Sequence, residues 1–206
     1  MTQIMTAPEM MTDAQIENAV NKLRDAMRKH RSEITSNTAQ HVLGIKNLGT
    51  IMFAPFRERA LAVSNIIVRK VTVNRGRSQQ EALYTTGCAQ YVDRKVVDSM
   101  PKGEGDEVEV MFFKPDLSQR NGFISDDDLK REFELRGLKP ADPISVAAVN
   151  EADPSFVNKR PHGTYWKDIK GDLCYATFDH TDERRVRVKS GDRGWSDYWW
   201  FAGLRK

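Results

Sequence analysis

The spacing of apolar residues changes along this chain, and this change constrains the fold more than any other feature of the sequence. Over residues 12–34 the apolar side chains recur at helical intervals, which is the pattern of a helix with one apolar stripe. These residues are Ile16, Val20, Leu23, Met27 and Ile34. From residue 161 on, short runs rich in aromatic and β-branched residues alternate with polar connectors, which is typical of antiparallel strands. The sequence therefore predicts the α+β class.

We expect five consecutive parts in this α+β chain. They are a flexible tail at 1–11, an N-terminal amphipathic helix at 12–36, a small mixed α/β body at 37–116, a helical connector at 117–160 and a C-terminal antiparallel β-meander at 161–206. Within the body we expect a short buried strand or turn after residue 38, a helix from Arg57, and strands over 66–73 and 107–114. The meander is expected to have four strands, near residues 165–167, 173–178, 184–189 and 198–202.

Four helix starts are predicted from local capping motifs. Thr12 and Ser78 each precede a Gln or Glu by three residues, which fits the reciprocal capping box. Ser125 is followed by Asp126, Asp127 and Asp128, whose charges a helix N-terminus favours. The fourth start is Asp142, since a proline in the next position suits the first turn of a helix.

The composition is that of an ordinary globular protein. The 206 residues include 32 Lys and Arg against 29 Asp and Glu, and 39% are hydrophobic, which excludes a collagen, a disulfide-rich mini-protein and a wholly disordered chain. No apolar run approaches the roughly 18–20 residues of a membrane span, so we expect no membrane partner and a cytoplasmic location. We expect Cys88 and Cys174 to be buried thiols, although one long-range disulfide stays open.

Basic residues outnumber acidic ones in the first part of the chain, where residues 1–80 hold 12 Lys and Arg against 6 Asp and Glu. Four of these cations, Arg69, Lys70, Arg75 and Arg77, lie at the end of a predicted strand and in the turn after it. Projecting together, they could contact the phosphates of a nucleic acid. The alternative is a solvated strand edge whose charges prevent edge-to-edge pairing.

A second cationic group lies near the C-terminus. Arg185, Arg187 and Lys189 alternate with valines, which places all three on one face of a strand. Trp199 and Trp200 follow, and rings interleaved with cations suit the binding of single-stranded nucleic acid. The alternative is that these rings only build a core. Because adjacent strand residues point to opposite faces, we expect at least one tryptophan in the core.

A metal site is the least supported possibility. His162, His180 and Asp182 could converge as ligands of a hydrolytic metal ion, but no recognised metal-binding or nucleotide-binding motif accompanies them. We therefore expect no cofactor and no catalytic residues, and we favour a protein that is not an enzyme.

Several stretches resemble a recurring family of uncharacterised proteins from environmental bacteria and their mobile elements. They are RKVTVNRGRSQQEAL, YVDRKVVDSMPKGEGDEVEVMFFKPD, SDDDLKREFELRGLKPADP, AAVNEADPSF and YWWFAGLRK. The resemblance spans roughly residues 66–206 and brings no activity, fold or site residues with it. It implies that residues 1–65 are a variable extension on a common two-part body.

These observations lead to three functional hypotheses. The first is a non-catalytic binding module that contacts nucleic acid through the two cationic groups and the tryptophans. The second is a protein–protein adaptor or structural component that forms a homo-oligomer, or binds a protein partner, through residues 12–34. The third is a metal-dependent hydrolase around His162, His180 and Asp182.

Overall fold

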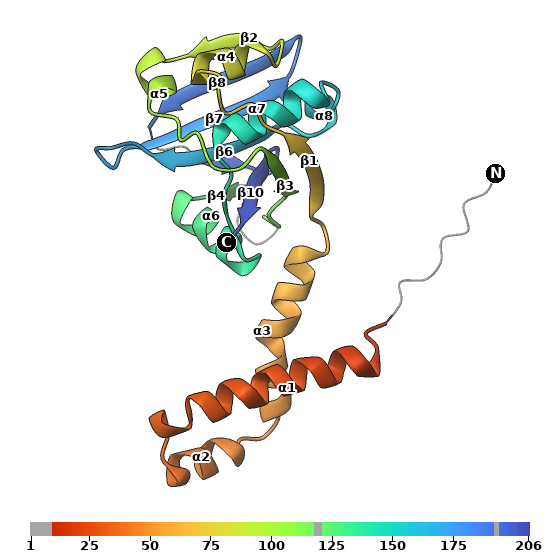
Figure 1. Cartoon of the computed structure of the whole chain (residues 1–206). Coiled ribbons are helices and arrows are strands. Elements are labelled where there is room, and N and C mark those ends of the chain that lie inside the picture. The colour runs from red at the N-terminus through yellow and green to blue at the C-terminus, as the bar shows by residue number, and fades with distance from the viewer. Residues whose placement is uncertain (1–9, 118–120, 192–193) are drawn as a thin grey trace, which may run out of the picture. The chain divides into compact units, whose positions relative to one another are not determined.

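The computed structural model describes residues 10–117, 121–191 and 194–206, and Figure 1 shows their course. The chain divides into a first unit up to Pro55 and a second unit from Phe56 to Lys206. The tail predicted at 1–11 lies outside the described residues, apart from Met10 and Met11. Among the described helices, none combines the length and the apolar character needed to cross a membrane.

The helices and strands alternate irregularly along the chain. In order they are α1 (Asp13–Lys29), the 3-10 turn η1 (Arg31–Glu33), α2 (Ser36–Leu43), α3 (Leu48–Val63), β1 (Ile67–Thr72), α4 (Gln79–Tyr84), β2 (Ala89–Val92), α5 (Arg94–Asp98), β3 (Glu107–Phe113), β4 (Phe123–Ile124), α6 (Asp126–Leu135), β5 (Leu138–Pro140), α7 (Pro143–Ala152), α8 (Phe156–Lys159), β6 (His162–Lys167), β7 (Leu173–His180), β8 (Arg184–Ser190), β9 (Trp195–Ser196) and β10 (Trp200–Arg205).

The first unit is helical, and α1 begins where its capping box predicts. The Thr12 side chain accepts the Gln15 N–H at 3.3 Å, and the Gln15 side chain accepts the Thr12 N–H at 2.9 Å. The helix ends at Lys29, with His30 as its C-cap, before the predicted end at residue 36. The buried strand considered after residue 38 is wrong, because α2 and α3 occupy most of this region; a turn at 44–47 separates the two helices, and α3 begins at Leu48, before the predicted start at Arg57.

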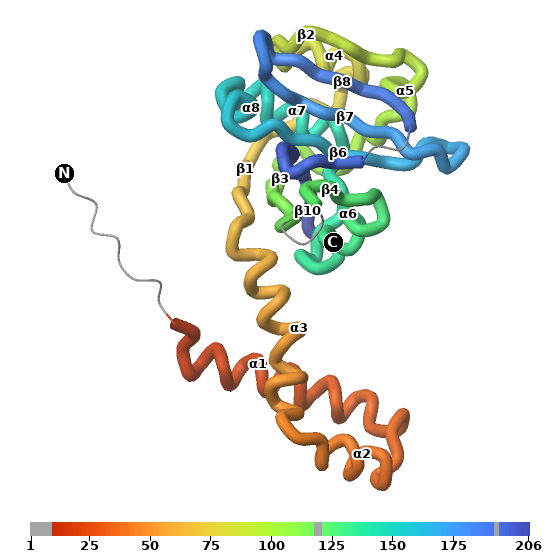
Figure 2. Tube along the Cα trace, turned by 180° about the vertical axis from the view of Figure 1, so that it is seen from behind, coloured from red at the N-terminus to blue at the C-terminus, as the bar shows by residue number. Residues whose placement is uncertain are grey.

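The second unit is built on one mixed sheet, which Figure 2 shows from behind. Its strand order is β1-β3-β10-β6-β7-β8-β2, and β5 pairs with the end of β10. The pairs β10–β6 and β2–β8 are parallel, and the other pairs of this sheet are antiparallel. The α+β class is therefore confirmed.

A separate hydrophobic core covers each face of this sheet. On one face α4, α5, α7 and α8 pack over Val110, Phe112 and Phe178. On the other face α6, β4 and β9 pack over Phe113 and Phe201. Phe112 and Phe113 are adjacent and point in opposite directions, as strand geometry requires. Cys88 and Cys174 are buried free thiols, as expected.

The order of the C-terminal strands differs from that of the predicted meander. Strands β6, β7 and β8 follow one another in antiparallel order, but β10 does not continue that order. It lies between β3 and β6, antiparallel to the first and parallel to the second. The predicted body and meander therefore contribute strands to the same sheet.

Candidate functional site

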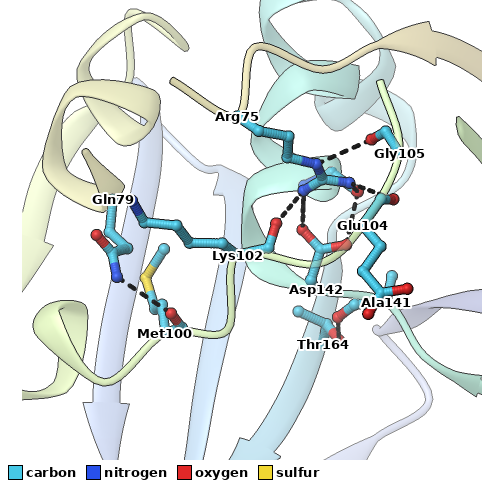
Figure 3. A network of polar contacts seen from close by, with 10 residues as sticks. Arg75, Gln79, Met100, Lys102, Glu104, Gly105, Ala141, Asp142 and Thr164 are labelled. Carbon is cyan, nitrogen blue, oxygen red and sulfur yellow. Dashed lines mark hydrogen bonds and ion pairs between the residues drawn. The ribbon is translucent and has the colours of Figure 1, made fainter. Parts of the chain in front are cut away.

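The candidate cations of the first group belong to the turn after β1 and to β1 itself, and Arg75 is enclosed there. Figure 3 shows the Arg75 guanidinium surrounded by carbonyl oxygens of the loop 102–105 and by Asp142. Its Nη1 lies 2.7 Å from the Asp142 carboxylate and also contacts the Lys102 carbonyl, and its Nε donates to the Gly105 carbonyl at 3.0 Å. Its Nη2 donates to the Ser145 hydroxyl at 2.9 Å.

This arrangement gives Arg75 a structural role. Its side chain is 15% exposed and that of Asp142 is 5% exposed, so the pair is shielded from solvent. Asp142 also accepts the Ser145 N–H, through which it caps α7. The arginine therefore ties the turn after β1 to the start of α7. Its guanidinium donors are engaged within the protein, so the geometry does not favour the predicted contact of Arg75 with phosphate, which stays a prediction.

The other cations of this group do not project together, contrary to expectation. Arg69 and Lys70 are adjacent on β1 and thus point to opposite faces. Lys70 lies 2.9 Å from Glu109 on β3, and this hydrogen bond and charge lower the pKa of the Glu109 carboxyl. Arg69 lies over the Phe156 ring, with 4.7 Å between the guanidinium carbon and the ring centroid.

Arg77, the fourth member, approaches a carboxylate from α7. Its Nη1 lies 2.7 Å from Glu151, and the same carboxylate accepts a hydrogen bond from the Thr85 hydroxyl. A cavity of about 530 Å³ opens between this turn and α7. Since both arginines at its wall, Arg75 and Arg77, are paired with carboxylates, the cavity offers no unneutralised cation of this group to an anion.

The second cationic group lies on one face of β8, as its alternation predicts. Val186 and Val188 are fully buried on the opposite face. Arg185 donates to Oδ1 of Asp179 from Nε at 3.0 Å and from Nη2 at 2.7 Å, while Arg187 donates to Oδ2. The bond to Asp179 raises the pKa of the Arg185 guanidinium.

Asp179 is buried in β7 and is the residue that sequence reasoning missed here. One carboxylate holds two guanidinium groups side by side, so the three groups together keep one positive charge. Lys189 lies on the same strand and is exposed, and within the described part of the chain it has no ion-pair partner.

The tryptophans do not form an exposed platform beside these cations. Trp199 is 5% exposed and packs edge-on against Trp195, with ring centroids 5.9 Å apart. Trp200 is half-buried among residues of the other core, where Arg160 lies 5.7 Å from its ring centroid. The expectation that at least one tryptophan belongs to the core is met by Trp199.

The rings that do accompany the arginines are tyrosines. The Arg187 guanidinium lies 5.8 Å from the Tyr91 ring centroid, and Tyr91 is about half exposed. Tyr198 is also about half exposed; burial and the charge of Asp179 raise the pKa of its hydroxyl, against the opposing effect of Arg185 and Arg187. No sequence pattern indicated Tyr91, because β2 joins β8 from far away in the chain.

The three residues considered as metal ligands, His162, His180 and Asp182, are not grouped as ligands in the part of the chain that the structure describes. His162 is completely buried, its Nδ1 is 2.7 Å from the Arg160 carbonyl, and its Nε2 is 2.9 Å from the Asn150 amide. Both ring nitrogens are thus occupied within the core, whereas His180 and Asp182 are exposed. Across the described residues, no group of three or more His, Cys, Asp or Glu is arranged to hold a metal ion.

The third candidate surface is the apolar stripe of α1. No residue from Met10 to Pro55 is buried, although this whole range is described. The stripe residues Val20, Leu23 and Met27 are 44%, 44% and 54% exposed. Large apolar side chains elsewhere in the unit are also exposed, namely Ile34, Val42, Leu43, Ile45, Ile51, Met52 and Phe53.

An exposed apolar surface of this extent is typical of a protein–protein contact. The first unit has the amphipathic pattern of a core-forming helix, yet it contains no core of its own in a single chain. Comparison of the chain with protein-family models, curated proteins and solved structures returns no match.

Proposed function

We propose that this protein is a non-catalytic structural component that self-assembles through the α1 helix of its first unit. The observation that carries the proposal is that residues 10–55 form well-defined helices without burying a single side chain. Isolated helices of this length are only marginally stable in water, and most helix stability comes from packing of an apolar face. A second chain would supply that packing.

The energetic gain is concentrated in the stripe. Full burial of a Leu or Met side chain contributes about 1.5–3 kcal/mol, and Leu23 and Met27 still expose about half of their surface. Each would therefore contribute about 1 kcal/mol on association. Two helices burying four such residues each gain enough to offset part of the entropy lost on association.

Light scattering on the full chain tests this function. The unsubstituted protein is expected to have at least twice the chain mass of 23.5 kDa, and the double variant Leu23→Asp/Met27→Asp is expected to have the mass of one chain. Asn18→Asp, on the polar face of α1, is the matched control and should leave the mass unchanged. The measurement is made at about 100 µM protein, a concentration well above the dissociation constant of a typical stable interface. A single-chain mass for the unsubstituted protein at this concentration would contradict the proposal.

Nucleic-acid binding through the cationic groups stays a prediction. Its remaining support is the placement of Arg185, Arg187 and Lys189 on one sheet face with the half-exposed rings of Tyr91 and Tyr198. Titration of a labelled single-stranded oligonucleotide at two salt concentrations tests it, because phosphate contacts weaken as salt rises. Affinity that Lys189→Ala lowers and salt weakens would support binding, whereas absent or salt-insensitive binding would remove it.

A further inference from the structure

The apolar stripe of α1 follows a heptad pattern. Ile16, Val20, Leu23 and Met27 are separated by 4, 3 and 4 residues, which corresponds to positions d, a, d and a of a two-stranded coiled coil. These four residues lie within the bounds of α1 and are all exposed. The helix therefore presents a complete seam for one partner helix.

The residues beside the seam distinguish the two possible directions of that partner. The positions called e hold Glu17, Arg24 and Arg31, and the positions called g within α1 hold Ala19 and Ala26. In a parallel pair, e of one helix faces g of the other, so Arg24 would face an alanine. In an antiparallel pair, e faces e, and Glu17 would face Arg24 of the second copy, twice by symmetry.

The charge along the helix favours the same direction. Asp13 and Glu17 lie in the first part of α1, whereas Arg28 and Lys29 lie in its last turn. A parallel pair would bring like charges together at both ends. An antiparallel pair brings the acidic start of one helix to the basic end of the other, and opposes the two helix dipoles.

We propose that α1 binds α1 of a second copy in antiparallel orientation about a two-fold axis near residues 21–22. In this register Ile16 packs against Met27 of the second copy, and Val20 packs against Leu23 of the second copy. The small side chains of Ala19 and Ala26 lie at the remaining flank and allow close approach. This inference rests on the proposed self-assembly. The partner is a second copy of this chain because the seam and the charges of α1 match those of another α1 in the antiparallel orientation.

Charge reversal in the full chain tests the orientation. Glu17→Arg and Arg24→Glu each create two like-charge contacts in the antiparallel dimer, so each is expected to raise the dissociation constant about tenfold. The double variant restores opposite charges and is expected to return within about twofold of the unsubstituted protein. Asn18→Arg on the outer face is the control for charge alone. Single reversals without effect, or a double variant as weak as both singles combined, would overturn the antiparallel pairing.

Spin labels give an independent measurement. At 1.5 Å per residue, labels at Ala14→Cys would lie about 22 Å apart along the axis of an antiparallel pair, and labels at Asn21→Cys only about 2 Å apart. A parallel pair gives equal separations at both positions and would refute the inference. Cys88 and Cys174 are buried, and labelling of the unsubstituted chain measures their background.

The two proposals fail in different ways. If the unsubstituted chain is monomeric, self-assembly itself is wrong. If it is dimeric but the double reversal does not recover, or the two label separations are equal, only the antiparallel orientation is wrong.

Discussion

Acidification is expected to destabilise the second unit through His162. The Arg160 carbonyl can only accept a hydrogen bond, so Nδ1 of His162 carries the proton and Nε2 accepts from the Asn150 amide. The ring also stacks on Phe178 in the core. Burial lowers the pKa of His162 from its ordinary 6.5 to about 4, against the opposing effect of the Arg160 carbonyl.

The sign and size of the effect follow from this shift. Below pH 6.5 the unfolded chain binds a proton at this histidine, whereas the folded chain stays neutral until about pH 4. The stability contributed by the neutral ring is therefore complete above pH 6.5 and is lost as the pH falls toward 4. At pH 5 the loss amounts to about 2 kcal/mol, and over the whole interval to about 3 kcal/mol.

Urea unfolding at pH 7.5, 6 and 5 measures this loss. The free energy of unfolding of the natural protein is expected to fall by about 2 kcal/mol between the first and last values. His162→Gln keeps a neutral polar group at the site and cannot take up the proton, so it should start less stable but lose much less on acidification. Glu81 and Glu109 have pKa values lowered from 4.5, so their contribution to the free energy of unfolding is lost mainly below that pH. An equal loss in the natural protein and in the variant would refute the assignment to His162.

Two further predictions concern the loop around Arg75, and both are measured as changes in the free energy of unfolding. Gly103→Ala forces a side chain at a φ of +70° directly against the Asp142 carboxylate and should cost at least about 3 kcal/mol. Gly105→Ala has a φ of +73° but open space around it, so it should cost only about 1–2 kcal/mol; equal costs would contradict the clash. Arg75→Ala leaves Asp142 buried without its cation and should cost about 3–5 kcal/mol, whereas the more exposed Arg77→Ala should cost about 0–1 kcal/mol. Similar losses for the two arginine variants would show that the enclosure of Arg75 does not add to the free energy of unfolding.

The helix starts could be predicted because their determinants are local. Thr12, Ser78, Ser125 and Asp142 each cap a helix with a side chain that accepts the N–H three residues later, so a short stretch of sequence contains the whole interaction. The strand considered after residue 38 was wrong because this region lacks such a local signal. Its apolar run with an internal Pro55 suits a strand or a helix equally well, and nothing local decides between them.

The strand order and the site depended on distant partners. The aromatic residues over 198–202 indicated a strand but could not show that β10 enters between β3 and β6. The cations could be named from the sequence, but their partners lie elsewhere in the chain: Asp142, the N-cap of α7, for Arg75, and Asp179 on β7 for Arg185. A single sequence shows that a cation is present, but only the fold shows that it is already neutralised.

The central position of β10 affects how the protein is made. Strand β3 can pair with β1 soon after synthesis, but its other edge stays unpaired until residues 200–205 have left the ribosome. For most of translation the central edge of the sheet therefore stays unpaired and its apolar side chains stay exposed to solvent, which favours misfolding and aggregation. The α1 helix spans Asp13–Lys29 and therefore leaves the ribosome well before β10, so in the proposed self-assembly two growing chains would pair through α1 before their sheets close.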